Sequence, residues 1–154
     1  MNQDTNIVNL RGYLGKDLEF SHEIFGEKFY TTTIKVDRLS DSKDVLPVTI
    51  SERLLEDINL EENNYFNISG QLRSYNKVVD NKNKLTVFAR ELNVENENDN
   101  KDPNNIFLDG FLCKNPIHRK TPLGREITDL LVAINRPYNK SDYIPSIVWG
   151  RNAK

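Results

Sequence analysis

The chain carries the same sequence pattern twice, and this repeat restricts the folds that it can adopt. When the sequence is shifted by 98 positions, residues 6–53 align with residues 104–151 without a gap. Ten of the 48 aligned pairs are identical, and several of them are glycines, prolines or alternating apolar residues, where backbone geometry limits the choice. We interpret the chain as a duplicated module whose second copy contains only the first half of the pattern. The identical pairs are Asn6/Asn104, Leu10/Leu108, Gly12/Gly110, Leu14/Leu112, Lys16/Lys114, Gly26/Gly124, Arg38/Arg136, Asp44/Asp142, Pro47/Pro145 and Arg53/Arg151.

The composition is that of a globular protein, with 37% hydrophobic and 29% charged residues among 154. This length allows one large domain or two small ones. The chain has no apolar run of about 20 residues that would span a bilayer, and Met1–Asp4 lacks the pattern of a signal peptide. Because Cys113 is the one cysteine, no intramolecular disulfide can form, and we expect an intracellular, cytoplasmic protein with no membrane contact.

Charge is distributed unevenly along the chain. Residues 1–100 hold 12 Lys and Arg against 18 Asp and Glu, a net charge of −6. Residues 101–154 hold 9 against 5, a net charge of +4, so that the two parts sum to −2. We expect any contact with a polyanion to be made by the second part. The same asymmetry is also compatible with two small domains that differ without a functional reason.

The residue pattern of the first copy predicts five strands and one short helix. The strands are rich in alternating apolar, β-branched and aromatic residues. Pro47 inside the third strand implies an edge or a bulge, and Ser51 is a plausible helix N-cap. The expected elements are strands over 7–14, 29–36, 45–50, 65–72 and 85–94, with the helix over 51–58.

Three strands, a helix and two further strands match an all-β fold with a short helix, the OB-fold, which is a five-stranded Greek-key barrel. A small β-sandwich fits nearly as well, because periodicity does not determine topology. We expect a first OB-fold over 1–95 and a polar linker over 96–105. Residues 106–154 would form the first three strands of a second OB-fold, over 106–114, 126–135 and 142–150.

Three strands in about 50 residues bury little apolar surface. Either the sequence is a fragment of a longer protein, or another chain supplies the remaining strands; we favour the fragment.

Several segments of the second copy follow one another in a distinctive order. They are Leu108-Asp-Gly-Phe-Leu112, Pro116 with Arg119-Lys-Thr-Pro-Leu-Gly124, Leu130-Leu-Val-Ala-Ile-Asn-Arg136 and Tyr143-Ile-Pro-Ser-Ile-Val-Trp-Gly150. In this order they resemble the first half of the bacterial single-stranded DNA-binding protein family. In the first copy, Leu10–Gly15 resembles that family more faintly, and Ile68-Ser-Gly-Gln-Leu-Arg73 is similar to its fourth strand.

The resemblance implies tandem OB-folds that bind single-stranded DNA with little sequence preference and assemble into homo-oligomers. It implies roles in DNA replication, recombination and DNA repair, with proteins of those processes as possible partners and the bacterial nucleoid as the location. It implies no catalysis.

Unpaired DNA offers base faces for aromatic stacking and phosphates for cations. In the second copy the family's stacking positions correspond to Tyr138, Tyr143 and Trp149, and the last two are six residues apart, so an unbulged strand places them on one face. The first copy carries Ser40, Val45 and Ser51 instead, which predicts weak DNA binding or a scaffold role. The other candidate DNA-binding residues are Arg119, Lys120, Arg125, Arg136, Lys140 and Arg151, together with Arg73, Tyr75 and Lys77 of the first copy.

The sequence offers no pattern that would support catalysis. His22 and His118 are 96 residues apart, so with one cysteine no zinc-site spacing occurs. Glycine-rich phosphate loops and nucleophile motifs are absent from the sequence. We expect no enzyme activity, no metal and no cofactor. The alternative to DNA binding is an OB-fold interaction or accessory module of the replication machinery, which the acidic first copy without rings favours.

Overall fold

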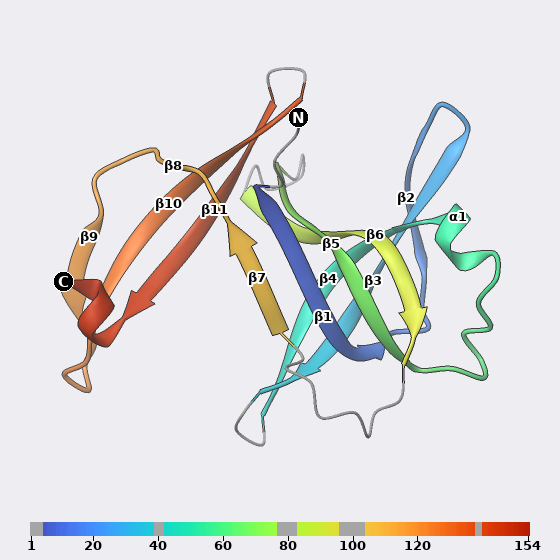
Figure 1. Ribbon diagram of the computed structural model, residues 1–154, viewed down its shortest axis with the longest axis horizontal. Helices are drawn as coiled ribbons and strands as arrows, with labels where there is room; N and C mark the ends of the chain where they lie inside the picture. Colours follow the sequence, from blue (N-terminus) through green and yellow to red (C-terminus); the bar gives the residue numbers. More distant parts are fainter. Residues whose placement is uncertain (1–4, 39–41, 77–82, 96–103, 138–139) are drawn as a thin grey trace.

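The computed structural model describes residues 5–38, 42–76, 83–95, 104–137 and 140–154, and strands dominate them (Figure 1). The first repeat contains β1 (Asn6–Leu14), β2 (Glu19–Ile24), β3 (Glu27–Asp37), β4 (Lys43–Ser51), α1 (Glu52–Leu55), β5 (Tyr65–Asn76) and β6 (Asn83–Val94). The second repeat contains β7 (Asn104–Leu108), β8 (Phe111–Leu112), β9 (Ile117–Lys120), β10 (Glu126–Arg136), β11 (Lys140–Trp149) and the 3-10 turn η1 (Gly150–Ala153).

The first repeat is a closed barrel. Its strands belong to a sheet with the order β2-β3-β4-β6-β5-β1-β7. Closure comes from β1, which pairs with β5 on one side and also with β3, where Tyr13 lies opposite Lys35. The strands β4 and β6 pair in parallel, and the other pairs in this sheet are antiparallel. This connectivity confirms the predicted OB-fold and excludes the β-sandwich.

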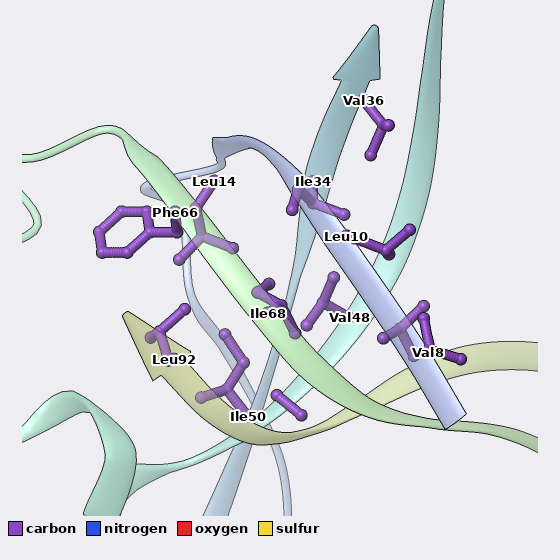
Figure 2. Packing of buried hydrophobic residues seen from close by; sticks show 12 residues of the cluster. Val8, Leu10, Leu14, Ile34, Val36, Val48, Ile50, Phe66, Ile68 and Leu92 are labelled. Carbon is purple, nitrogen blue, oxygen red and sulfur yellow. The ribbon is translucent and has the colours of Figure 1, made fainter. Parts of the chain in front are cut away.

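Inward-facing side chains of β1, β3, β4, β5 and β6 fill this barrel (Figure 2). Leu10, Ile34, Ile50 and Phe66 have no exposed surface. Full burial of such a side chain stabilises the fold by about 1.5–3 kcal/mol. The core therefore follows the alternation that the sequence of each strand shows.

A glycine is required where β1 crosses β3. A Cβ atom at Gly12 would lie 2.1 Å from the carbonyl oxygen of Lys35, and one at Gly110 would lie 2.3 Å from that of Ala133. Lys35 and Ala133 are also counterparts in the repeat. The same crossing thus explains the same glycine in both copies.

The second repeat has the strand registers of the first. Phe29 lies opposite Ser51 between β3 and β4, and their counterparts Ile127 and Trp149 lie opposite each other between β10 and β11. The crossing pair Tyr13 and Lys35 likewise corresponds to Phe111 and Ala133. The sequence repeat is therefore a repeat in three dimensions.

The two repeats meet through β1 and β7, which pair antiparallel (Figure 1). In this pairing Val8 lies opposite Ile106, and these two residues also occupy equivalent positions in the two repeats. An antiparallel pair of equivalent residues marks a local pseudo-twofold axis. The axis passes between Val8 and Ile106, and it relates the two repeats.

The structure corrects several details of the sequence analysis. It adds β2 and β9 in segments that we expected to be turns, and α1 has four residues where we expected a helix over 51–58. The predicted strand over 106–114 is divided into β7 and β8, and β7 begins at Asn104. Ser51 is the N-cap, since its hydroxyl accepts the Arg53 N–H at 3.2 Å.

Pro47 lies in an unbulged part of β4. The β3–β4 register continues without a break past Thr33, its partner, and the pairing with β6 covers only Val48 and Thr49. The edge interpretation is therefore right and the bulge interpretation is wrong. Among the described residues, no helix has the length and apolar character that crossing a membrane would need.

Candidate nucleic-acid interface

The outward face of β11 presents aromatic rings to solvent. The β10–β11 register has no bulge, and exposure alternates along β11, with Asp142 and Ile144 buried. Tyr143 is 45% exposed and Trp149 is 53% exposed, and Pro145 and Ile147 are exposed between them. The prediction that both rings lie on one face is confirmed. In an open strand face of this kind, a ring can contact a flat ligand without rearrangement of the backbone.

Arg119 lies on the same face as Trp149. Both residues lie directly opposite Ile127, one across the β9–β10 pair and one across the β10–β11 pair. Residues that lie opposite each other in a sheet share a face. Ile127 is buried, and its strand β10 lies between β9, which carries Arg119, and β11, which carries Trp149.

Asp129 holds Arg119 in place on this face. The Arg119 guanidinium donates to both carboxylate oxygens of Asp129, at 2.7 and 3.4 Å. This hydrogen bond is the main reason that the pKa of Asp129 is lowered below the ordinary value of an aspartate, and it raises the pKa of Arg119. The carboxylate also competes with any phosphate for the same guanidinium.

The strand β11 is attached to β5 of the first repeat through a buried carboxylate. Asp142 has no exposed surface, and its Oδ1 accepts the Ser74 N–H at 2.9 Å. The Tyr143 N–H donates to the Ser74 hydroxyl at 2.9 Å. Arg136 Nε lies 2.9 Å from Asp142 Oδ2 in an ion pair, although its N–H is not directed at that oxygen. These contacts bring Tyr143 beside β5.

Arginines gather at this junction. The Arg73 guanidinium lies over the Phe88 ring, 4.0 Å from its centre. Burial lowers the pKa of Arg73, and the charges of Arg136 and Arg90 lower it further, while Asp142 opposes them. The buried Nε groups of Arg73 and Arg136 make no hydrogen bond among the described residues. Arg73 and Arg136 thus lie near the Asp142 carboxylate and Arg90 lies near Arg73, which leaves the cluster with a positive net charge and with unused donors.

The other predicted residues are placed less closely together. Arg136 shares no face with the rings, because Ala133 lies opposite Tyr143 and Arg136 is three residues further along β10. Tyr75 is 48% exposed on β5, next to Ser74. Tyr138 and Lys77 lie outside the described residues. The remaining cations are exposed at the ends of the second repeat; they are Lys120, Arg125, Lys140 and Arg151.

In the first repeat, the end of the matching face at Thr49 and Ser51 is closed by its own side chains, whereas Val45, the counterpart of Tyr143, is exposed. Thr49 and Ser51 are 6% and 4% exposed, and the Thr49 hydroxyl hydrogen-bonds that of Thr86 at 2.9 Å. Beside them, the buried Phe29 ring stacks on His22 and contacts Phe88. At Ser51, the counterpart of Trp149, the absence of a ring thus coincides with a surface that offers no open platform.

Sequence reasoning missed Phe88 and Arg90. Both lie on β6, whose counterpart is not part of the second repeat, so the comparison of the two copies could not single them out. The signal that could have found them is their position on the strand that pairs with β5, where Arg73 was already a candidate. On β6, the Phe88 ring contacts the Arg73 guanidinium, and Arg90 adds a further positive charge near it.

The described residues offer no other site with clear chemistry. They contain no group of three or more His, Cys, Asp or Glu side chains that could hold a metal ion. A cavity of about 400 Å³ lies between the repeats, lined mainly by aliphatic residues such as Leu10, Leu72 and Ile144. Because no charged side chain lines it, this cavity is unsuited to a phosphate.

Comparisons with known proteins identify the family. No protein-family model and no curated protein sequence matches the chain. Among solved structures, the dimeric N-terminal domain of PriB protein from Thermoanaerobacter tencongensis is 50% identical, with a TM-score of 0.53, and the match covers 61% of this chain and 100% of that one. The single-stranded DNA-binding protein from Thermus aquaticus has the same fold at 18% identity, with a TM-score of 0.69 and coverage of 96% and 75%.

A deletion mutant of the Thermus protein gives a similar result, with a TM-score of 0.67, 17% identity and coverage of 96% and 77%. The repeat geometry, the OB-fold and the sequence identity over the whole PriB domain agree with the resemblance found in the sequence. The chain belongs to the bacterial single-stranded DNA-binding protein family.

Proposed function

We propose that the chain binds single-stranded DNA with little sequence preference, through the outward face of β10 and β11 and the arginine cluster at the junction. Exposed rings and guanidiniums are what unpaired nucleotides require, since every base has a stacking face and every linkage has a charge. The observation that carries this proposal is the exposure of Tyr143 and Trp149 on one face with Arg119 beside them.

The path of the strand follows from the positions of these groups. Tyr143 lies between Trp149, at the far end of β11, and Ser74, which precedes Tyr75 on β5. A strand that stacks on Trp149 and Tyr143 then reaches Arg73, Arg90 and Arg136, whose net charge attracts a phosphodiester. We assign the bases to the second repeat and a phosphate to the junction, while residues 1–95 act mainly as a scaffold.

The proposal includes the cellular context of the family. Single-stranded DNA arises in replication, recombination and repair, so we assign the protein to those processes, in the bacterial nucleoid. The polar segment over 96–105 would act as the connection between the two OB-fold units, although β7 already begins at Asn104.

Fluorescence titration tests this function directly, because Trp149 is the sole tryptophan. Oligo-dT should quench its emission, and raising the salt concentration should weaken binding, with log K falling by about 0.7 per phosphate contact per unit of log salt. Trp149→Phe keeps a ring and should retain binding when followed by anisotropy of labelled oligo-dT. A folded protein with neither quenching nor anisotropy change at low salt would refute DNA binding.

A second function is favoured by one observation. The outward face of the first repeat is closed at Thr49 and Ser51, and its half of the chain is acidic. An accessory module that contacts other replication proteins would need only this scaffold. Loss of DNA binding with retained binding to replication proteins would support that alternative.

A further inference from the structure

The two repeats carry equivalent hairpins with opposite charge. The β2–β3 hairpin over 19–28 and the β9–β10 hairpin over 117–126 are counterparts, and Gly26 and Gly124 at their tips both have φ of 83°. The first hairpin contains three acidic residues and one basic residue, a charge of −2. The second contains three basic residues and one acidic residue, a charge of +2. The backbone was kept while the charge was reversed.

Both hairpins are open on their outer edges. Every residue of β2 and of β9 is exposed. The strand β2 is the end of its sheet, and β9 pairs only with β10 among the described residues. Phe25 and Leu123 at the two tips are almost fully exposed. An edge strand with free backbone groups and exposed apolar side chains is a site for pairing with another strand.

The charges of these edges are largely unused within the molecule. Glu19 and Glu23 on β2 form no ion pair among the described residues, and the same is true of Lys120 and Arg125 on the other hairpin. Arg119 differs, because Asp129 neutralises it. Two acidic groups and two basic groups thus remain available to a partner.

The hairpins cannot pair within one molecule. They project from opposite ends of its longest axis (Figure 1). We propose that the acidic β2 edge of one molecule pairs with the basic β9 edge of a second copy of this chain. The contact is heterologous, so it joins molecules head to tail and generates open chains. Opposite charges across neighbouring strands fix the choice of partner edge.

This association affects DNA binding in a defined way. Lys120 and Arg125 cannot contact carboxylates and phosphates at the same time, so single-stranded DNA at the second repeat should release the neighbouring molecule. This consequence alone rests on the proposed function. The self-association itself is measured without DNA, so a failure of self-association is distinguishable from a failure of DNA binding.

Sedimentation velocity of the full chain in low salt, without DNA, tests the contact. The average sedimentation coefficient should rise with protein concentration without reaching a plateau, and added salt should reverse the rise. Charge reversal by Glu19→Lys with Glu23→Lys, or by Lys120→Glu with Arg125→Glu, should abolish this growth. Circular dichroism should confirm that both variants remain folded, since all four side chains are exposed.

An equimolar mixture of the two reversed variants gives the decisive result. One variant then has two basic edges and the other has two acidic edges, so the mixture should associate again although neither variant does so alone. The Glu19→Lys/Glu23→Lys variant, whose second repeat is unchanged, should still bind oligo-dT. Growth that survives either reversal, or a mixture that remains as small as its components, would overturn the proposal.

Discussion

The outward faces of β4 and β11 occupy equivalent places in the two repeats but have different side chains. On β4, Thr49 and Ser51 are buried beside Phe29, and the strand itself, Lys43–Ser51, carries no aromatic residue. On β11, the counterparts Ile147 and Trp149 are exposed. The glycines at the strand crossing, Gly12 and Gly110, are the same in both copies. The comparison teaches that the fold constrains inward and crossing positions and leaves the outward positions free for function.

A second comparison concerns one ion pair that both repeats retain. Arg38 and Asp44 form it on the surface, whereas Arg136 and Asp142 form it at the junction, where Asp142 is fully buried against β5. The pair is thus a common feature of the repeat, and only the second copy uses it to join the two halves of the molecule.

Removal of the two carboxylates should have unequal effects. Asp142→Ala removes a fully buried carboxylate and leaves the partly buried Arg136 unpaired, and we expect it to lower the free energy of unfolding by about 3–5 kcal/mol. Asp44→Ala removes an exposed partner and should leave the urea midpoint almost unchanged. Equal midpoints for the two variants would show that the junction does not depend on this carboxylate.

The crossing glycines give the next largest effect. Gly12→Ala places a methyl group 2.1 Å from the Lys35 carbonyl oxygen, and such overpacking should cost about 2–3 kcal/mol. Gly26→Ala is a matched control, since a Cβ there meets nothing and only the positive φ is strained, at about 1 kcal/mol. Urea unfolding followed by circular dichroism distinguishes them. A Gly12 variant as stable as the Gly26 variant would contradict the close approach of β1 and β3.

Trp149→Ala tests the stacking on the second repeat. Loss of the ring should weaken oligo-dT binding by about 1–3 kcal/mol, measured by anisotropy of a labelled oligonucleotide. Thermal unfolding must be compared in parallel. A variant that loses structure in the second repeat would indicate that the indole supports packing rather than base contact.

A ring transferred to the first repeat sharpens the comparison. Val45 is 55% exposed and is the counterpart of Tyr143. Val45→Tyr should strengthen binding to a long oligo-dT by about 1 kcal/mol, the lower value of a stacking contact. Val45→Leu serves as the control for added apolar surface. Equal affinities of the two variants would mean that this end of β4 lies off the DNA path.

Asp129→Asn should produce the smallest change. It frees Arg119 for phosphate, so oligo-dT affinity should rise and the salt dependence should steepen by about 0.7 in slope. Because Arg119 lowers the pKa of Asp129, the carboxylate stays charged as pH falls through the ordinary aspartate range. Wild-type protein at mildly acidic pH should therefore not imitate the variant. Unchanged affinity of Asp129→Asn would remove Arg119 from the interface.

The sequence predicted those parts of the molecule that periodicity and the internal repeat encode. Alternating apolar residues located β3, β4, β5 and β6, and an even spacing put Tyr143 and Trp149 on one face. The strands β2 and β9 escaped because all their residues are exposed, so no alternation marks them. Arg136 lies on the face of β10 opposite to the rings, and Arg90 lies near Arg73 at the junction of the two repeats. Both placements depend on how distant strands pair, which a linear pattern does not contain.

Photo-crosslinking of oligonucleotides that carry 5-iododeoxyuridine, followed by peptide mass spectrometry, tests the division between the two repeats most directly. We expect crosslinks at Tyr143 and Trp149 on β11, and none at Val45 or Ser51 on β4. Crosslinks confined to the β4 peptide, with β11 unmodified, would contradict the assignment of the bases to the second repeat.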